Sequence, residues 1–145
     1  MVISPGGHPD DCDLYIAQRA LELTKCAIQD GGEILFLAAC ANGIGAERTM
    51  EHFYNKLTGP LDQILTEKPG QYKLYSHKPY RFAQLISRLR KLWVHSQLDE
   101  GMIRAIHMHP AKDPQAIVNQ WIDENPLVKI LFVDGANKLA LRMKP

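Results

Sequence analysis

The sequence predicts an α/β fold, an open and mainly parallel sheet of about four strands with helices on both faces, Rossmann-like and doubly wound. Three observations lead to this expectation. Short apolar runs alternate along the chain with segments of helical periodicity. One run, Glu33–Cys40, is almost continuously apolar, which is typical of a parallel strand covered on both faces. Glycine and proline turns separate the segments, so we expect βαβ units with right-handed crossovers.

The N-terminal stretch from Val2 to Arg19 organises the prediction. Val2–Ile3 is expected to be a short strand that ends at the turn Ser4–Gly7. The acidic segment Asp10–Asp13 then supplies an N-cap and first-turn carboxylates for a helix that should run to about Gln29. The positive end of a helix attracts carboxylates and phosphates, which makes this helix start a candidate anion site.

The remaining elements follow from periodicity and turn residues. We expect a helix carrying Met50, Phe53, Tyr54 and Leu57, then a short helix with Leu61, Ile64 and Leu65, and a break at Pro69–Gly70. After the break we expect a helix from about Pro79 to Leu89 with Tyr80, Ala83, Leu85 and Ile86 inward, a strand Leu92–His95 and a short helical segment Leu98–Ile106. The last two elements are a helix with Asp113 as N-cap and Pro114 at its first position, and a strand Val128–Val133.

Ligands of open α/β sheets bind outside the carboxyl ends of the strands. The turns at Gly6–Gly7, Gly43–Gly45, His95–Ser96 and Asp134–Gly135 each follow a predicted strand, so we expect them to share one rim. The glycines of Gly43–Gly45 serve either a tight turn or an anion cradle made of backbone N–H groups.

Composition narrows the function classes. The chain has 145 residues, suited to a single domain over 1–145, and its formal net charge of +1 recommends neither nucleic acid nor an anionic membrane as a partner. Its three cysteines have no CxxC spacing, which favours a reducing cytoplasm over a disulfide framework or a zinc ribbon. A core strand that begins at the second residue suggests a fragment, a split gene product or an excised domain.

Candidate polar residues lie mainly on the predicted first helix. Tyr15 and Arg19 are four residues apart, so they are neighbours on one helix face, where a hydroxyl and a guanidinium can grip a carboxylate. Alternatively, Arg19 pairs with Asp11 or Glu22 at the surface and Tyr15 caps the edge of the core. His8 either caps its turn or contacts a substrate.

The other histidines give weaker signals. His107 and His109 would lie on one face of a strand, where a metal could bridge them, but no carboxylate stands at ligand spacing and loop positions are the alternative. His77 contacts the rim or closes a loop. No complete active site follows from local chemistry.

Taken together, the turn Ser4–Gly7 and the predicted helix after it resemble the C-terminal domain of the nickel-pincer lactate racemase family. The residues that carry the resemblance are Ile3–Pro9, Asp11, Asp13–Tyr15, Ala20–Leu21, Gly31–Gly32 with the strand to Cys40, Gly43 and Gly45, His77–Lys78 and Tyr80, Leu98–Asp99, Pro110–Ala111 and Asp134–Gly135. The resemblance implies a two-domain isomerase that racemises or epimerises a small 2-hydroxy acid, with this domain gripping the substrate.

The resemblance also implies where the chemistry resides. A nickel-pincer nucleotide on the N-terminal domain exchanges a hydride with the substrate, so this chain holds no cofactor, metal or catalytic residue and needs that domain in cis or as a separate chain. A Tyr-Gln-x-x-Lys segment makes the family's substrate contacts. Here Tyr15 is kept, Ile16 replaces glutamine and Arg19 replaces lysine. The rival hypothesis is a stand-alone, non-catalytic binding or structural module.

Overall fold

The computed structural model describes residues 1–66, 77–139 and 141, and the break expected at Pro69–Gly70 lies outside them. Its centre is a parallel sheet of five strands in the order β4-β3-β2-β1-β5. The strands are β1 (Val2–Ile3), β2 (Glu33–Leu37), β3 (Lys91–His95), β4 (His109–Pro110) and β5 (Phe132–Val133). Every pairing is parallel, which confirms the predicted α/β class with one strand more than expected.

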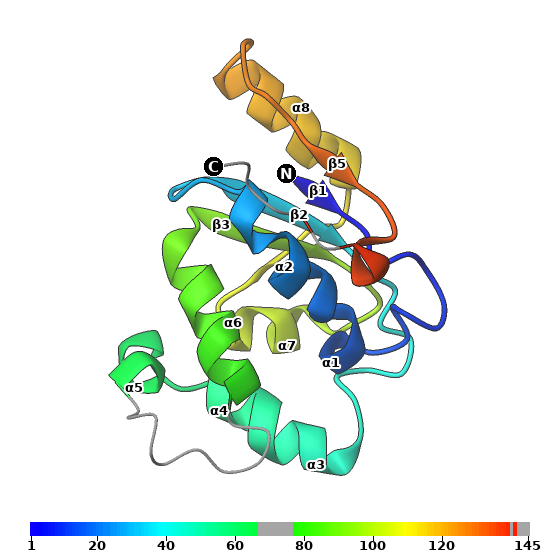
Figure 1. Ribbon diagram of the computed structural model, residues 1–145, viewed down its shortest axis with the longest axis vertical. Coiled ribbons are helices and arrows are strands. Elements are labelled where there is room, and N and C mark those ends of the chain that lie inside the picture. The colour runs from blue at the N-terminus through cyan, green and yellow to red at the C-terminus, as the bar shows by residue number, and fades with distance from the viewer. Residues whose placement is uncertain (67–76, 140, 142–145) are drawn as a thin grey trace.

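Helices fill the connections between the strands. They are α1 (Leu14–Ala17), α2 (Arg19–Thr24), the 3₁₀ turn η1 (Lys25–Ala27), α3 (Glu47–Thr49), the π-helical turn η2 (Met50–Tyr54), α4 (Asn55–Leu57), α5 (Leu61–Thr66), α6 (His77–Arg88), α7 (Glu100–Ala105), α8 (Pro114–Glu124) and the 3₁₀ turn η4 (Ala136–Lys138). In Figure 1, α8 lies on one side of the sheet, while α1, α2, α6 and α7 lie on the other.

The strand order explains this division. From β1 to β4 the chain steps across the sheet in one direction, and right-handed crossovers then place all intervening helices on the same face. The chain next returns past β1 to form β5 at the far edge. Because this last crossover, from β4 to β5, runs across the sheet in the opposite direction, its helix α8 lies on the opposite face. The sheet is therefore doubly wound, with the strand order reversing beside β1.

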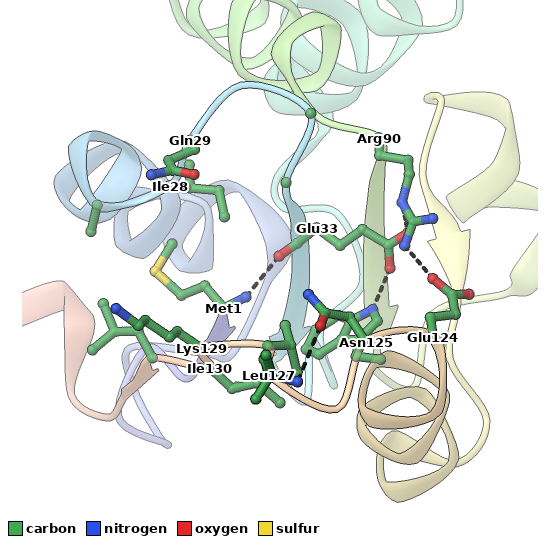
Figure 2. Close-up of a pocket in the computed structure, with 16 residues that line it drawn as sticks. Met1, Ile28, Gln29, Glu33, Arg90, Glu124, Asn125, Leu127, Lys129 and Ile130 are labelled. Atoms are coloured by element: carbon green, nitrogen blue, oxygen red, sulfur yellow. Dashed lines mark hydrogen bonds and ion pairs between the residues drawn. The ribbon is translucent and has the colours of Figure 1, made fainter.

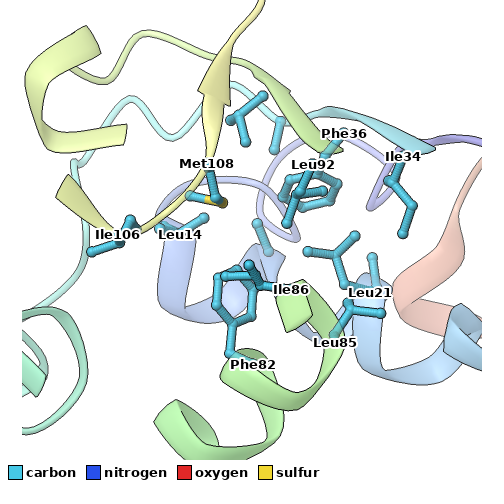
Figure 3. Packing of buried hydrophobic residues seen from close by; sticks show 14 of the residues in the cluster. Leu14, Leu21, Ile34, Phe36, Phe82, Leu85, Ile86, Leu92, Ile106 and Met108 are labelled. Atoms are coloured by element: carbon cyan, nitrogen blue, oxygen red, sulfur yellow. The ribbon is translucent and has the colours of Figure 1, made fainter. Parts of the chain in front are cut away.

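The larger core lies beneath the helices of the first face. Ile34 and Phe36 alternate inward from β2 and meet Leu92 of β3. Leu21 of α2 and Phe82 of α6 reach the same cluster, as Figure 3 shows. Ala83, Leu85 and Ile86 are buried in α6, as predicted, whereas Tyr80 is only half-buried. Phe82, which was not among the residues predicted to point inward, is also buried.

The opposite face has a smaller core. Val2 and Leu35 point to this side and pack with Ala111 and with Trp121 of α8. Asp113 caps α8 as predicted, because its carboxylate accepts hydrogen bonds from the backbone N–H groups of Gln115 (2.9 Å) and Ala116 (3.2 Å).

One predicted strand is shorter than expected, and one strand was not among the predicted elements. The last strand, expected over Val128–Val133, contains only Phe132–Val133, because β1 offers just two residues as pairing partners. Conversely, His109–Pro110 forms an edge strand against β3 that the pattern did not predict. A proline is tolerated there because an edge strand pairs on one side only.

The long first helix also differs from the prediction. The continuous helix expected to reach Gln29 is divided at Gln18 into α1 and α2 and ends at Thr24, followed by η1. The hydroxyl of Thr24 donates to the Ala20 carbonyl oxygen (2.7 Å), a side-chain bond that competes with continued α-helix. The backbone at Ile28 is already extended.

Candidate functional site

The four strand-end turns do share one rim, as predicted. The turn after β1 is joined to the turn after β5 by two backbone hydrogen bonds of 2.9 Å. The Ser4 N–H donates to the Val133 carbonyl oxygen, and the Ala136 N–H donates to the Ser4 carbonyl oxygen. A Cβ atom on Gly6 would lie 3.0 Å from the Cα atom of Gly135, so only glycine allows this approach. The turns after β2 and β3 are joined by the bond from Gln97 to Ala39.

The start of α1 is held against this rim by its own backbone. The N–H groups of Leu14 and Tyr15 donate to the carbonyl oxygens of Gly43 (3.1 Å) and Ile44 (3.0 Å). The Ile16 N–H donates to the capping carboxylate of Asp13 (2.8 Å). The prediction of an anion site at the helix start is therefore wrong, since protein acceptors already occupy these donors and α1 has only four residues.

The same contacts decide the role of Gly43–Gly45. Both glycines have positive φ angles, 77° and 141°, as a tight turn requires. The carbonyl groups of this turn cap α1, and the Gly43 N–H donates back to Cys40 (2.9 Å). Of the two alternatives left by the sequence, the structure favours the tight turn.

Tyr15 lies at the boundary between core and rim. Its ring packs edge-on against Phe53, with ring centres 5.5 Å apart. The side chain is half-buried and belongs to the margin of the larger core. This part of the alternative interpretation, in which Tyr15 caps the core edge, is confirmed.

Arg19 does not follow that alternative. Glu22 pairs with Lys25 (2.6 Å) and Arg81 (3.3 Å), and Asp11 instead accepts a hydrogen bond from the Ala39 N–H. Within the described ranges, no hydrogen bond or ion pair engages the Arg19 guanidinium, which is exposed. A planar guanidinium without a carboxylate partner is available to an incoming anion.

Lys78 is a cation that the sequence did not identify as a site residue. Its ammonium nitrogen lies 3.3 Å above the centre of the Tyr15 ring and 3.3 Å from the Tyr15 carbonyl oxygen, to which it donates. Burial lowers the pKa of Lys78, as does nearby Arg19, while Asp13 acts in the opposite direction. The only sequence signal was its place beside His77 in the family pattern.

The other two predicted site residues are less engaged. Ile16 is 40% exposed, so an apolar side chain faces solvent beside Tyr15. His8 is exposed in the loop after β1, next to a cis peptide bond with Pro9. Among the described residues, no hydrogen bond or ion pair joins His8 to Tyr15 or Arg19.

The paired histidines do not share a strand. His107 precedes β4 with a left-handed φ of 64°, and its Nε2 atom lies 2.9 Å from the Gly59 carbonyl oxygen. His109 lies in β4, where its ring stands 5.3 Å from that of Trp93. No group of three or more potential metal ligands occurs in the part of the chain that the structure describes. His77, the remaining candidate, opens α6 as an exposed residue.

A pocket of about 820 Å³ lies at the opposite, amino-terminal edge of the sheet. Figure 2 shows that its polar groups contact one another: Met1 donates to the Glu33 carbonyl oxygen (2.7 Å) and Arg90 pairs with Glu124 (2.7 Å). Burial lowers the pKa of the Met1 amino group to about 6. Because these groups are paired and lie away from the carboxyl rim, we do not assign the pocket as the substrate site.

Fold and rim together define a doubly wound α/β domain whose first helix starts at the carboxyl edge of its sheet, where Lys78 lies over Tyr15. The family model described as the lactate racemase C-terminal domain matches residues 1–129, and the chain belongs to this family. No helix among the described residues is long and apolar enough to cross a membrane.

Two comparisons from the same organism agree with the family. A lactate racemase of Thermoanaerobacterium thermosaccharolyticum is 24% identical over 116 residues, which are 78% of this chain and 27% of that protein. The lactate racemase apoprotein structure from this bacterium is similar in fold, with a TM-score of 0.72 and 22% identity over 97% of this chain and 35% of that one. The chain thus spans about a third of the lactate racemases it matches.

Proposed function

We propose that this chain is the substrate-gripping C-terminal domain of an enzyme that interconverts the stereoisomers of a 2-hydroxy acid. The observation that carries the proposal is the Arg19 guanidinium, which is exposed four residues after Tyr15 and engaged by no carboxylate in the described residues. Arginine binds a carboxylate through two parallel hydrogen bonds. Membership of the lactate racemase C-terminal domain family supports this role.

On this proposal the cofactor belongs to another domain. This assignment rests on the family resemblance, which implies that a lysine and a histidine of the N-terminal domain hold the nickel-pincer nucleotide. We assign the nickel and the chemistry at the α-carbon to an N-terminal racemase domain, in cis or as a separate chain. The role of this chain is to bind and orient the substrate carboxylate.

The test combines the chain with an N-terminal racemase domain of the same family and measures the interconversion of D and L isomers for a panel of 2-hydroxy acids. Arg19→Ala should lower kcat/KM by about 10- to 100-fold, because a charge-assisted hydrogen bond to the substrate is lost. Arg81→Ala is the matched control, since Arg81 is also exposed but pairs with Glu22, and a surface pair contributes little.

Two results would contradict the proposal. Equal activity of Arg19→Ala and the unchanged enzyme would remove Arg19 from the substrate grip. Strong racemisation by the 145-residue chain alone would show that no second domain is needed. A folded two-domain assembly without any racemisation would instead favour a non-catalytic binding module, the alternative to which the exposed, apolar Ile16 points.

A further inference from the structure

Lys78, in the first turn of α6, contacts both the ring and the backbone of Tyr15. Its ammonium nitrogen lies 3.3 Å above the ring centre and donates to the carbonyl oxygen of the same residue, also at 3.3 Å. The side-chain amide of Gln18 donates to that oxygen as well (3.3 Å), at the residue that divides α1 from α2. One cation therefore fixes the Tyr15 side chain relative to its own main chain.

The same face of α6 supports the Tyr15 ring a second time, through two phenylalanines. Lys78 and Phe82 are four residues apart in α6, so they lie on one face of the helix. Phe82 packs against Phe53 of η2 with ring centres 5.8 Å apart, and Phe53 in turn meets the Tyr15 ring at 5.5 Å in an edge-to-face arrangement. The Tyr15 ring is thus held by an ammonium group on its face and by an aromatic ring from another element.

The packing of α6 onto the domain does not depend on Lys78. Phe82 and Ala83 of α6 are buried in the larger core, whereas Lys78 is only half-buried. Burial lowers the pKa of Lys78, an effect that the Asp13 carboxylate opposes, so the charged form carries a desolvation cost at this place. An apolar side chain would pack there without that cost, and the ammonium group therefore indicates a role toward Tyr15 itself.

Tyr15 stands where a ligand of this fold is expected. Its N–H group donates to the Ile44 carbonyl oxygen (3.0 Å) in the turn after β2, at the carboxyl rim of the sheet. We infer that Lys78 is a positioning residue, which fixes the place of the Tyr15 hydroxyl at this rim without touching the substrate itself. The inference rests on the proposed function and adds a residue that acts on the substrate through another. A displacement of about 1 Å in a substrate-binding group can lower the rate about 100-fold, so the loss of this support should be measurable.

The experiment is a double-mutant cycle in the two-domain assembly, with racemisation as the readout. Lys78→Met should lower kcat/KM by about 10-fold or more, and Lys78→Arg should restore most of it, because a guanidinium also stacks on an aromatic face. In the Tyr15→Phe background, Lys78→Met should change kcat/KM by less than about twofold, since the hydroxyl that Lys78 positions is already absent. Lys91→Met is the matched control, because the Lys91 ammonium lies 4.7 Å from the centre of the Trp93 ring, at the start of β3 and away from the rim.

A measurement on the 145-residue chain alone separates failure of this inference from failure of the proposed function. In NMR spectra, Lys78→Met should shift the Tyr15 ring resonances, whereas Lys91→Met should leave them in place. Thermal unfolding should show both variants folded, with midpoints lowered by less than about 5 °C.

The outcomes separate the two ideas. If the assembly does not racemise but the Tyr15 resonances shift, Lys78 positions Tyr15 and the proposed function fails. Unshifted Tyr15 resonances would overturn the inference. An equal loss of kcat/KM with and without the Tyr15 hydroxyl would also overturn it, because Lys78 would then act on the substrate directly. An unfolded Lys78→Met chain would do the same by showing that Lys78 supports the fold as a whole.

Discussion

Removing the Glu33 carboxylate should destabilise the domain by loosening α8 from the sheet. Glu33 is 8% exposed at the start of β2, and its Oε2 atom accepts hydrogen bonds from the indole N–H groups of Trp93 (2.9 Å) and Trp121. Its Oε1 atom lies 2.8 Å from the Nε atom of Arg90. One carboxylate thus joins β2, β3 and α8.

The magnitude follows from which partners are buried. Glu33→Ala leaves the buried Trp121 N–H without an acceptor, which should lower the free energy of unfolding by about 1–3 kcal/mol. The half-buried Trp93 N–H also loses its acceptor, which should lower it by about 1 kcal/mol more. The Arg90 side chain is 53% exposed, so its lost pair adds little. We expect a loss of roughly 3 kcal/mol in the free energy of unfolding for Glu33→Ala, and about 1 kcal/mol for Glu33→Gln, which keeps one acceptor oxygen.

Urea unfolding followed by tryptophan emission measures this directly, because the chain has two tryptophans and both contact Glu33. Glu51→Ala is the control, since the Glu51 side chain is 73% exposed and should change the free energy by less than about 0.5 kcal/mol. A loss below about 1 kcal/mol for Glu33→Ala would refute the reasoning, because it would mean that the indole N–H groups are satisfied without this carboxylate.

Three further predictions concern Cys40 and Ile16. Burial, together with the carboxylates of Asp11 and Asp13, raises the pKa of the Cys40 thiol from 9.0 to about 12. At pH 8 the exposed Cys26 should therefore react with a thiol reagent, while Cys40 should react only after the chain unfolds. Above pH 9 the folded state keeps the Cys40 proton while the unfolded state loses it, so the free energy of unfolding should fall as pH rises from about 9 to 12. Cys40→Ala should flatten that pH dependence. If the pH dependence of the variant equals that of the unchanged chain, the raised pKa of Cys40 is contradicted. Ile16→Gln should raise kcat/KM for 2-hydroxypropanoate in the two-domain assembly by up to about tenfold, through one added hydrogen bond, and no change would show that position 16 does not face the substrate.

The parts of the fold that could be predicted depend on local chemistry. The strand predicted over Glu33–Cys40 was visible because an apolar run of this length bounded by glycines is typical of a buried strand, although β2 ends at Leu37. Asp113 and Pro114 indicate a helix start through two adjacent residues. The short strand His109–Pro110 could not be predicted, because its two residues are extended only through their pairing with β3.

In the candidate site, too, features set by neighbouring residues could be predicted, and contacts between distant segments could not. The spacing of Tyr15 and Arg19 is readable from the sequence, although the structure divides the expected helix between them into α1 and α2. The structure also shows that Arg19 does not form the surface pairs considered for it. The contact between Lys78 and Tyr15 joins residues 63 positions apart, which no local pattern encodes. The anion-binding helix start was wrongly predicted because the carbonyl groups of Gly43 and Ile44, which occupy its donors, come from a separate turn.

Those two backbone contacts have an evolutionary consequence. The start of α1 is fastened to the turn after β2 by main-chain groups, which every amino acid except proline supplies at the donor positions Leu14 and Tyr15. Side chains at positions 16 and 19 can therefore be exchanged without moving the frame that presents them. On the proposed function, single residues on this fixed platform set the substrate, and Ile16 and Arg19 stand where the resemblance implies glutamine and lysine.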